Sequence, residues 1–316
     1  MKAIVYTKYG SPDVLQLKEI EKPAPKDNEI MIRVHAASLN AYDWRAMRAK
    51  PFFVRLTGFG LLKPKHKVLG SDMAGQVEAV GTNVKQFQPG DEVFGCGGHG
   101  GFGEYACVDE KRFVLKPANL TFEEAAAVPM AALTALQALR DKGQIKPGQK
   151  VLINGASGGV GTFAVQIAKS FDTEVTGVCS TTKMDLVRSI GADHVIDYTQ
   201  EDITKNKQQY DLILDIAVYR SVSKYKRILS SGGIYVVAGG SFARMLQLMF
   251  MSMTGAKNMK SMLANVNQKD LLFILELIKA GKVKPIIDKR YPLNEAAEAI
   301  RYLEEGHARG KIVITV

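Results

Sequence analysis

A glycine-rich turn between an apolar strand and an amphipathic helix most constrains how this 316-residue chain can fold. Residues 151–153 are Val-Leu-Ile, a compact apolar run that predicts a buried strand. The turn follows at 154–159. A helix is expected over 160–170, because apolar residues there fall on one face at 3.6-residue spacing: Val160, Ala164, Ile167 and Ala168.

Within the turn, Ala156, Gly158 and Gly161 occupy the three places of the G-x-G-x-x-G spacing, with Ala in the first. The middle glycine lets the backbone approach a pyrophosphate, and the third allows close packing of helix on strand. The N–H groups and positive dipole end of the helix face the phosphates in such a turn. The sequence therefore predicts a dinucleotide site whose contacts are Ala156, Ser157, Gly158, Gly159 and Val160.

The residues after the next strand indicate which nucleotide binds. An acidic residue about 20 positions beyond the turn would favour NAD, because it hydrogen-bonds the ribose 2′-hydroxyl. The chain has Ser180, Thr181, Thr182 and Lys183 there, and hydroxyls with a cation suit a 2′-phosphate. We expect NADPH as the cofactor. The alternative is that Ser180 and Thr181 only cap the following helix.

The chain changes character near residue 122. Before it, short apolar runs broken by turn residues predict strands without regular intervening helices, at 3–6, 30–34, 76–80 and 105–108. After it, helical stretches such as 183–190 alternate with apolar runs at 175–179, 195–196, 212–214 and 234–238. This alternation is typical of a doubly wound parallel sheet covered on both faces.

The end of the chain predicts helices over 270–280 and 294–305 and a strand over 311–316. Because that strand comes so late, we expect it to pair with the β-rich first part. Residues 245–262 hold six of the twelve Met, and an adaptable surface of this kind fits a lid, a dimer contact, a membrane face or core packing.

Composition limits the possible partners. The net charge of +10 suits an anionic partner, but the basic residues are scattered. The densest basic group is predicted to be a solvated surface: Lys63, Lys65, His66 and Lys67. No nucleic-acid motif accompanies the charge, so no nucleic-acid partner is expected. Three Cys without a CxxC indicate a reducing compartment. The sequence shows neither a charged-then-apolar leader nor a run of about 18 apolar residues that could span a membrane, so we expect the protein in the cytoplasm.

Six motifs spread along the chain resemble the medium-chain dehydrogenase/reductase superfamily, in particular its zinc-lacking quinone oxidoreductase-like branch. They lie at residues 39–44 (LNAYDW), 70–75 (GSDMAG), 89–94 (PGDEVF), 154–161 (NGASGGVG), 191–198 (GADHVIDY) and 310–313 (GKIV).

The resemblance implies an α/β protein with a GroES-like β-rich catalytic domain at 1–123 and 264–316, a Rossmann domain at 124–263, and a homodimer. Asn40 and Thr134 would touch the nicotinamide half of the cofactor. The 2′-phosphate would lie among Ser180, Lys183 and Tyr198. The nicotinamide pocket would be lined by Ala238, Gly239 and Gly240.

The chain departs from the family pattern at two places. Many quinone oxidoreductases carry the phosphate-binding lysine one position later, where this chain has Met184, so Lys183 must reach from a shifted position. The segment 215–217 also lacks the Gly often found at its third position, which is Ala217 here.

The resemblance also bears on metal binding. Zinc-bearing relatives hold a catalytic ion near the positions of Asn40 and Ser71 and a structural ion with four clustered Cys, and this chain has neither ligand set. Cys96 and His99 form a lone Cys-x-x-His with no second pair of ligands. These two residues are therefore predicted to be ordinary structural residues and not metal ligands. No metal is therefore expected.

Without a Lewis acid, a conjugated acceptor is easier to reduce than an isolated ketone, because hydride at its β carbon leaves charge spread over an enolate. The predicted substrate is a small hydrophobic conjugated carbonyl: a quinone, an enone or an alkenal. Arg45 is the candidate for stabilising the enolate, and Tyr42 or water for supplying the proton. Alternatively, Arg45 only pairs with cofactor phosphates or Asp43. Residues 51–62 are unusually apolar and predict either a wall of the substrate pocket or a packed surface loop.

Two other functions remain open. The chain could hold NADPH as a sensor or scaffold with little turnover. It could also be a peripheral membrane reductase, given its basic surface and the Met-rich segment 245–262.

Overall fold

The computed structural model describes residues 1–49, 55, 60–205, 208–239, 244, 247 and 257–316. The chain forms two compact units. The first contains Met1–Met130, Val266–Leu272 and Pro285–Val316; the second contains Ala131–Asn265 and Phe273–Lys284.

The first unit is built on a mainly antiparallel sheet in which β3 (Glu29–Ser38) lies between β15 (Lys311–Thr315) and β4 (Asp72–Val80). The order continues through β5 (Glu92–Cys96) to β7 (Phe113–Leu115), while β14 (Ile287–Pro292) pairs parallel with β15. The other elements of this unit are β6 (Tyr105–Asp109) on β3, the hairpin β1 (Lys2–Val5) and β2 (Gln16–Glu19), α1 (Ala41–Arg48), α2 (Phe122–Ala126) and α9 (Ala296–Glu304).

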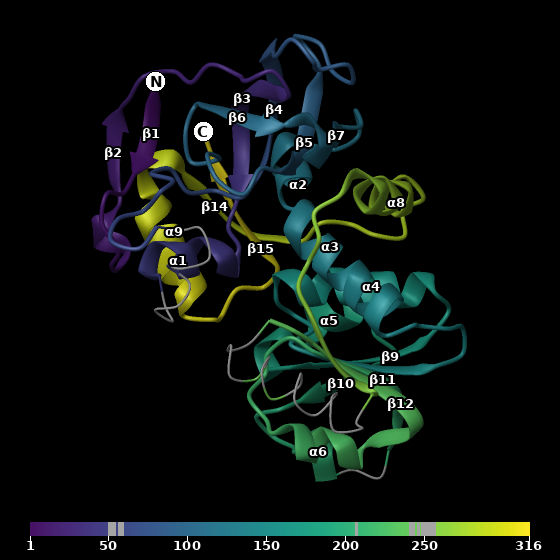
Figure 1. The fold of residues 1–316 in the computed structure, drawn as a ribbon. Helices are drawn as coiled ribbons and strands as arrows, with labels where there is room; N and C mark the ends of the chain where they lie inside the picture. Colours follow the sequence, from purple (N-terminus) through teal and green to yellow (C-terminus); the bar gives the residue numbers. More distant parts are fainter. Residues whose placement is uncertain (50–54, 56–59, 206–207, 240–243, 245–246, 248–256) are drawn as a thin grey trace. The chain divides into compact units, whose positions relative to one another are not determined.

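β15 confirms that the last strand joins the β-rich part of the chain. Val313 faces Ser38 and Thr315 faces Ala36 in an antiparallel register, and Figure 1 shows yellow β15 alongside purple β3. Burial explains the pairing, because Ile312, Val313 and Ile314 are at most 1% exposed. Apolar strands of this kind need cover on both faces.

The expectation that no regular helix interrupts the early strands was wrong. α1 begins directly after β3, where the Asp43 carboxylate accepts a hydrogen bond from the backbone N–H of Asn40 at 2.8 Å. It ends at Ala49, whose φ of 45° is in the left-handed region. The helix has eight residues, which is too few to give a clear helical period in the sequence.

The second unit contains a parallel sheet in the order β10–β9–β8–β11–β12–β13, which is the Rossmann order and confirms the predicted doubly wound fold. Its strands are β8 (Lys150–Asn154), β9 (Glu174–Cys179), β10 (His194–Asp197), β11 (Tyr210–Asp215), β12 (Leu229–Ala238) and β13 (Met259–Met262). The remaining helices include α3 (Pro129–Gln137), α4 (Gly159–Ser170), α5 (Met184–Ser189), α6 (Val222–Arg227) and α8 (Gln268–Lys279).

The strand order reverses between β8 and β11, and ligands bind at such switch points in open α/β sheets. The two strands end at Asn154 and Asp215, which are hydrogen-bonded to each other at 2.7 Å. Asp215 also accepts a hydrogen bond from the Tyr235 hydroxyl, and Tyr225 accepts one from the Asn154 amide. This buried cluster fixes the strand ends from which the glycine-rich turn begins.

Candidate active site

The glycine-rich turn leaves β8 at Gly155, whose φ of 90° is a conformation that side chains rarely adopt. The N–H groups of Gly155 and Ala156 donate to Val178 O on β9, at 3.1 and 3.0 Å. A Cβ on Gly161 would lie 2.0 Å from Gly155 O, so this position in α4 requires glycine. The close approach holds the start of α4 against the end of β8, as the sequence predicts.

Gly158 is different, because a Cβ there would meet nothing nearer than Gly155 O at 3.6 Å. It is the N-cap residue of α4, and the first N–H groups of a helix have no partner within the helix. The space beside the Gly158 backbone, directly in front of the N-terminus of α4, is therefore open. These residues fit a diphosphate, which would be held by the N–H groups that open α4.

The region after β9 differs from the sequence interpretation in one respect. The Thr181 hydroxyl donates to the Asp197 carboxylate, which also accepts from the Thr199 hydroxyl at 2.7 Å. The Thr181 hydrogen bond lowers the pKa of Asp197. A carboxylate thus lies within the polar cluster that the sequence assigned to a phosphate. The reason it was missed is that Asp197 comes from the neighbouring strand, β10.

The other predicted phosphate contacts lie at the same end of the sheet. Ser180 follows β9, and its side chain makes no cap hydrogen bond to the 3₁₀ turn Thr181–Lys183. Lys183 closes that turn, and Tyr198 directly follows β10. The Tyr198 ring is 43% exposed and lies 5.5 Å from the ring of Tyr219. The predicted role of these side chains toward a 2′-phosphate remains a prediction.

In the first unit, Asn40 lies in a buried polar network that reaches three parts of the chain. Its Oδ1 accepts a hydrogen bond from Lys311 Nζ at 2.6 Å. Its Nδ2 donates to Ser71 Oγ at 3.1 Å and to Asp72 Oδ2 at 2.9 Å. Lys311 Nζ also donates to Leu39 O at 2.9 Å and lies 3.9 Å from Asp72 Oδ2. Both ends of the Asn40 amide are therefore fixed.

The charges of this network are deeply buried. Lys311 is 2% exposed, and Asp43 and Asp72 are 0% exposed. Burial lowers the pKa of Lys311 and raises that of Asp72, and each charge opposes the shift of the other. Burial also raises the pKa of Asp43 to about 7, although backbone N–H groups of Asn40, Gly70 and Ser71 donate to its carboxylate.

Sequence reasoning missed the role of Lys311. The lysine was noticed only as part of the motif at 310–313, and a lysine at the start of a strand is ordinarily solvated. A hint was available, because the three residues after it, Ile312, Val313 and Ile314, are all apolar, which indicates a strand buried on both faces.

Tyr42 and Arg45 lie three residues apart on α1 and so project from the same side of the helix. Tyr42 is 39% exposed, and partial burial raises the pKa of its hydroxyl to about 12. The Arg45 guanidinium lies 5.3 Å from the centre of the Trp44 ring, and burial lowers its pKa. The structure thus brings the two predicted catalytic side chains to one side of α1.

The remaining predicted contacts are only partly described. Thr134 lies in α3, and Ala238 ends β12. Gly239 follows with a φ of 112°, and Gly240 lies outside the described residues. Most of the apolar segment 51–62 and of the Met-rich segment 245–262 also lies outside them.

Cys96 and His99 do not form a pair. Cys96 is 1% exposed on β5, and burial followed by the charge of Asp72 raises its thiol pKa well above the usual value. His99 instead stacks on His66, with ring centroids 3.7 Å apart. Within the part of the chain that the structure describes, no three His, Cys, Asp or Glu side chains gather where they could hold a metal ion.

Comparison with known proteins identifies the family. Residues 26–118 match the alcohol dehydrogenase GroES-like domain, and residues 190–314 match the family described as zinc-binding dehydrogenase. The chain is 34% identical over 330 residues to the chloroplast quinone oxidoreductase QR1 of Triphysaria versicolor, covering 99% of this chain and 98% of that protein. It is also 34% identical to the chloroplast NADPH-dependent alkenal/one oxidoreductase of Arabidopsis thaliana, covering 99% and 79%.

Among solved structures, the quinone oxidoreductase from Coxiella burnetii superposes with a TM-score of 0.90 at 31% identity, covering 100% of this chain and 99% of that one. The chain therefore belongs to the quinone oxidoreductase-like part of the medium-chain dehydrogenase/reductase superfamily, and it is an oxidoreductase. The predicted GroES-like and Rossmann parts are confirmed. No helix in the described ranges is long and apolar enough to cross a membrane.

The buried network provides a test of stability. Lys311→Met removes the ammonium and leaves Asp72 and Asn40 without it, so we expect the free energy of unfolding to fall by about 3 kcal/mol. Urea denaturation would measure this. Lys282→Met, at an exposed lysine, is the control and should change little. Adding Asp72→Asn to Lys311→Met should restore part of the loss; equal stability of Lys311→Met and the parent would contradict the role of the network.

Proposed function

We propose that this protein binds NADPH and transfers its hydride to a small conjugated carbonyl compound, such as a quinone, an enone or an alkenal, without a metal ion. The observation that carries the proposal is the open space at Gly158 in front of α4, at the switch point of a Rossmann sheet. The names of its relatives, which include quinone and alkenal/one oxidoreductases, support the same class of acceptor.

The chemistry of the Asn40 network supports metal-independent reduction. Asn40 and Ser71, near whose positions the resemblance places the catalytic ion of zinc-bearing relatives, are hydrogen-bonded to each other. The Lys311 ammonium lies 2.6 Å from the only oxygen that the Asn40 side chain could offer to a cation. A second cation there would meet direct repulsion.

NADPH supplies the hydride when it is bound. The N–H groups that open α4 would hold its diphosphate, and Ser180, Lys183 and Tyr198 would hold its 2′-phosphate. The turn is completed by Ala156, Ser157, Gly159 and Val160. The proposed contacts of the nicotinamide half are Asn40, Thr134, Ala238, Gly239 and Gly240.

Arg45 would stabilise the enolate that hydride addition creates, since a guanidinium keeps its charge at neutral pH. Tyr42 would supply the proton that this enolate takes up. A homodimer in the cytoplasm remains our expectation.

The proposal is tested by nucleotide titration and turnover. The parent should bind NADPH saturably by calorimetry and oxidise it with at least one member of a panel of quinones, alkenals and cyclic enones. Gly158→Val should abolish NADPH binding, because the valine side chain would occupy the space proposed for the diphosphate. The melting temperature should stay the same, because that side chain would meet no closely packed protein atoms. Binding without any turnover would favour a sensor or scaffold, and absence of binding to the parent would overturn the proposal.

Nucleotide preference depends on Lys183. Lys183→Ala removes the cation proposed to bind the 2′-phosphate. The Kd for NADPH should therefore rise about tenfold, which is roughly the loss expected for one charge-assisted hydrogen bond. The Kd for NADH should stay within about twofold, which makes NADH the internal control. Equal weakening of both nucleotides would show that Lys183 does not recognise the extra phosphate.

Arg45 is tested through the rate. Arg45→Ala should lower kcat on an enone by roughly 10²-fold, the usual loss for one oxyanion-stabilising group, with little change in the Kd for NADPH. Arg45→Lys keeps the charge and should retain most of the rate. An unchanged kcat in Arg45→Ala would remove this residue from the mechanism, whereas a raised Kd would favour pairing with cofactor phosphates.

A further inference from the structure

The carboxylate of Asp197 lies beside the turn that follows β9, although it belongs to the next strand of the sheet. In the parallel pairing of β9 and β10, Asp197 is the register partner of Cys179, so the two strands end side by side. Ser180 and Thr181 follow Cys179 directly, and Tyr198 follows Asp197. Two of the residues proposed to hold the 2′-phosphate, Ser180 and Tyr198, therefore lie at the same strand ends as this carboxylate.

The Asp197 side chain is held by two threonines. Thr181 Oγ1 donates to Oδ2, and Thr199 donates to Oδ1 from its N–H at 2.9 Å and from its hydroxyl at 2.7 Å. The Thr181 hydroxyl, more than any other contact, lowers the pKa of Asp197, so the group is ionised at neutral pH. Because the threonine donors are uncharged, they fix the carboxylate in place without cancelling its charge.

The charges around this end of the sheet have both signs. Burial, followed by the charge of Asp197, raises the thiol pKa of Cys179 to about 11. The charges of Lys183 and Arg188 shift the pKa of the same thiol in the opposite direction. A carboxylate and two cations thus act on one point at the end of β9. A phosphate bound in the proposed cluster would be attracted by Lys183 and repelled by Asp197.

The Thr181 hydroxyl can offer a ligand only an acceptor. A carboxylate accepts hydrogen bonds and donates none, so the single proton of this hydroxyl is directed to Asp197. The other hydroxyl within reach, Thr199 Oγ1 at 3.1 Å, is a weaker acceptor than the charged carboxylate. Thr181 is exposed, and its oxygen keeps lone pairs to which a ribose 2′-hydroxyl could donate. A phosphate dianion has no proton to donate, so this hydroxyl suits NADH better than NADPH.

We propose that Asp197 is a specificity-determining residue that reduces the preference for NADPH and lets the same site accept NADH. This role rests on the proposed function, in which the cluster after β9 holds the 2′-phosphate. Two effects act in the same direction. The carboxylate charge opposes the phosphate of NADPH, and the Thr181 hydroxyl that it orients accepts from the free 2′-hydroxyl of NADH. Lys183 acts in the other direction, so the balance between Asp197 and Lys183 sets the ratio of the two affinities.

Calorimetric titration of both nucleotides tests the role of the charge. Asp197→Asn removes the charge at nearly the same size and should lower the Kd for NADPH about fivefold, the effect of one unfavourable charge pair in water-like surroundings. The Kd for NADH should stay within about twofold, because an uncharged 2′-hydroxyl interacts only weakly with a carboxylate charge. The gain for NADPH should shrink at high salt, since screening weakens the repulsion in the parent.

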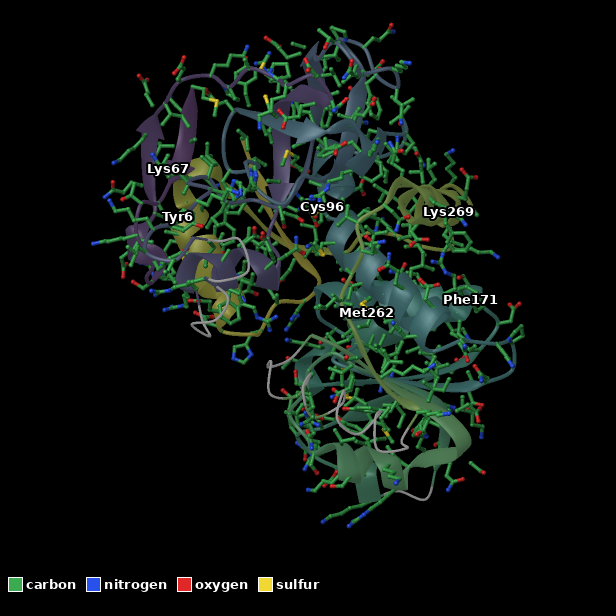
Figure 2. The ribbon with its side chains drawn as sticks, in the orientation of Figure 1. Tyr6, Lys67, Cys96, Phe171, Met262 and Lys269 are labelled. Carbon is green, nitrogen blue, oxygen red and sulfur yellow. The ribbon has the colours of Figure 1, made fainter. Side chains whose placement is uncertain are left out.

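Asp172→Asn is the charge control. Asp172 is exposed and directly follows Phe171, the C-cap residue of α4 that is labelled in Figure 2. It therefore lies a helix length of about 18 Å from the glycine-rich turn, beyond the Debye length of about 8 Å at physiological salt. Its φ of 56° is a conformation that Asn also adopts, so the substitution should not strain the fold. Neither Kd should change by more than about twofold.

Thr181→Val tests the orientation of the hydroxyl and keeps the shape of the side chain. It should raise the Kd for NADH about fivefold, the loss of one neutral hydrogen bond, without weakening NADPH. Thr181→Ser keeps the hydroxyl and should bind NADH as the parent does.

An unchanged or raised Kd for NADPH in Asp197→Asn, at the melting temperature of the parent, would exclude the proposed role of Asp197. If Asp197→Asn is less stable than the parent, Thr181→Val decides, and equal weakening of both nucleotides or no change in either would exclude it. A parent that binds neither nucleotide refutes the proposed function instead. A parent that binds NADPH, with the same ratio of affinities in every variant, refutes only the role of Asp197.

Discussion

The structure of the first unit depends on the buried ammonium of Lys311. It joins the start of β15 to the segment that follows β3, residues 271 positions away in the sequence, and lies 3.9 Å from the Asp72 carboxylate on β4. A buried charge without partners is strongly destabilising, so the three segments must come together for the lysine to be tolerated. The same contacts fix the Asn40 amide at the beginning of α1. The contacts of Lys311 therefore add to apolar burial in holding β15 against β3, and they also set the geometry of the Asn40 amide.

In the second unit, close backbone approach has a comparable effect. Gly161 allows α4 to lie against the turn at Gly155, and the cluster of Asn154, Asp215 and two tyrosines fixes the ends of the central strands. A helix N-terminus is thereby held at the switch point, with open space at Gly158. The backbone is closely packed at Gly161 and leaves open space at Gly158, where a phosphate would lie.

The geometry of the glycine-rich turn was predictable because its signals are local. The turn at 154–161 is a strand, a bend and a helix in direct succession, so its glycine spacing determines its geometry. The sequence did not reveal contacts whose partner comes from elsewhere in the chain. The Thr181 hydroxyl, in the polar cluster predicted to suit a phosphate, donates to Asp197 from the adjacent strand. α1 was missed because it is short and is fixed at its start by a side-chain contact to the backbone.

The sequence by itself determined the alternating strands and helices of the second unit and the Rossmann turn, because periodicity and turn chemistry act over a few neighbouring residues. The family followed from the resemblance of motifs spread along the chain. Only the tertiary structure decided the state of particular side chains. His66 belongs to a basic group that the sequence predicts to be solvated, and it is exposed as predicted; what the sequence did not predict is that its ring stacks on His99, 33 residues away, and that partial burial lowers the pKa of both rings. Lys311 is likewise an ordinary lysine in the sequence and a buried cation in the fold. Desolvation and electrostatic pairing depend on which distant segments meet, and only the folded chain brings them together.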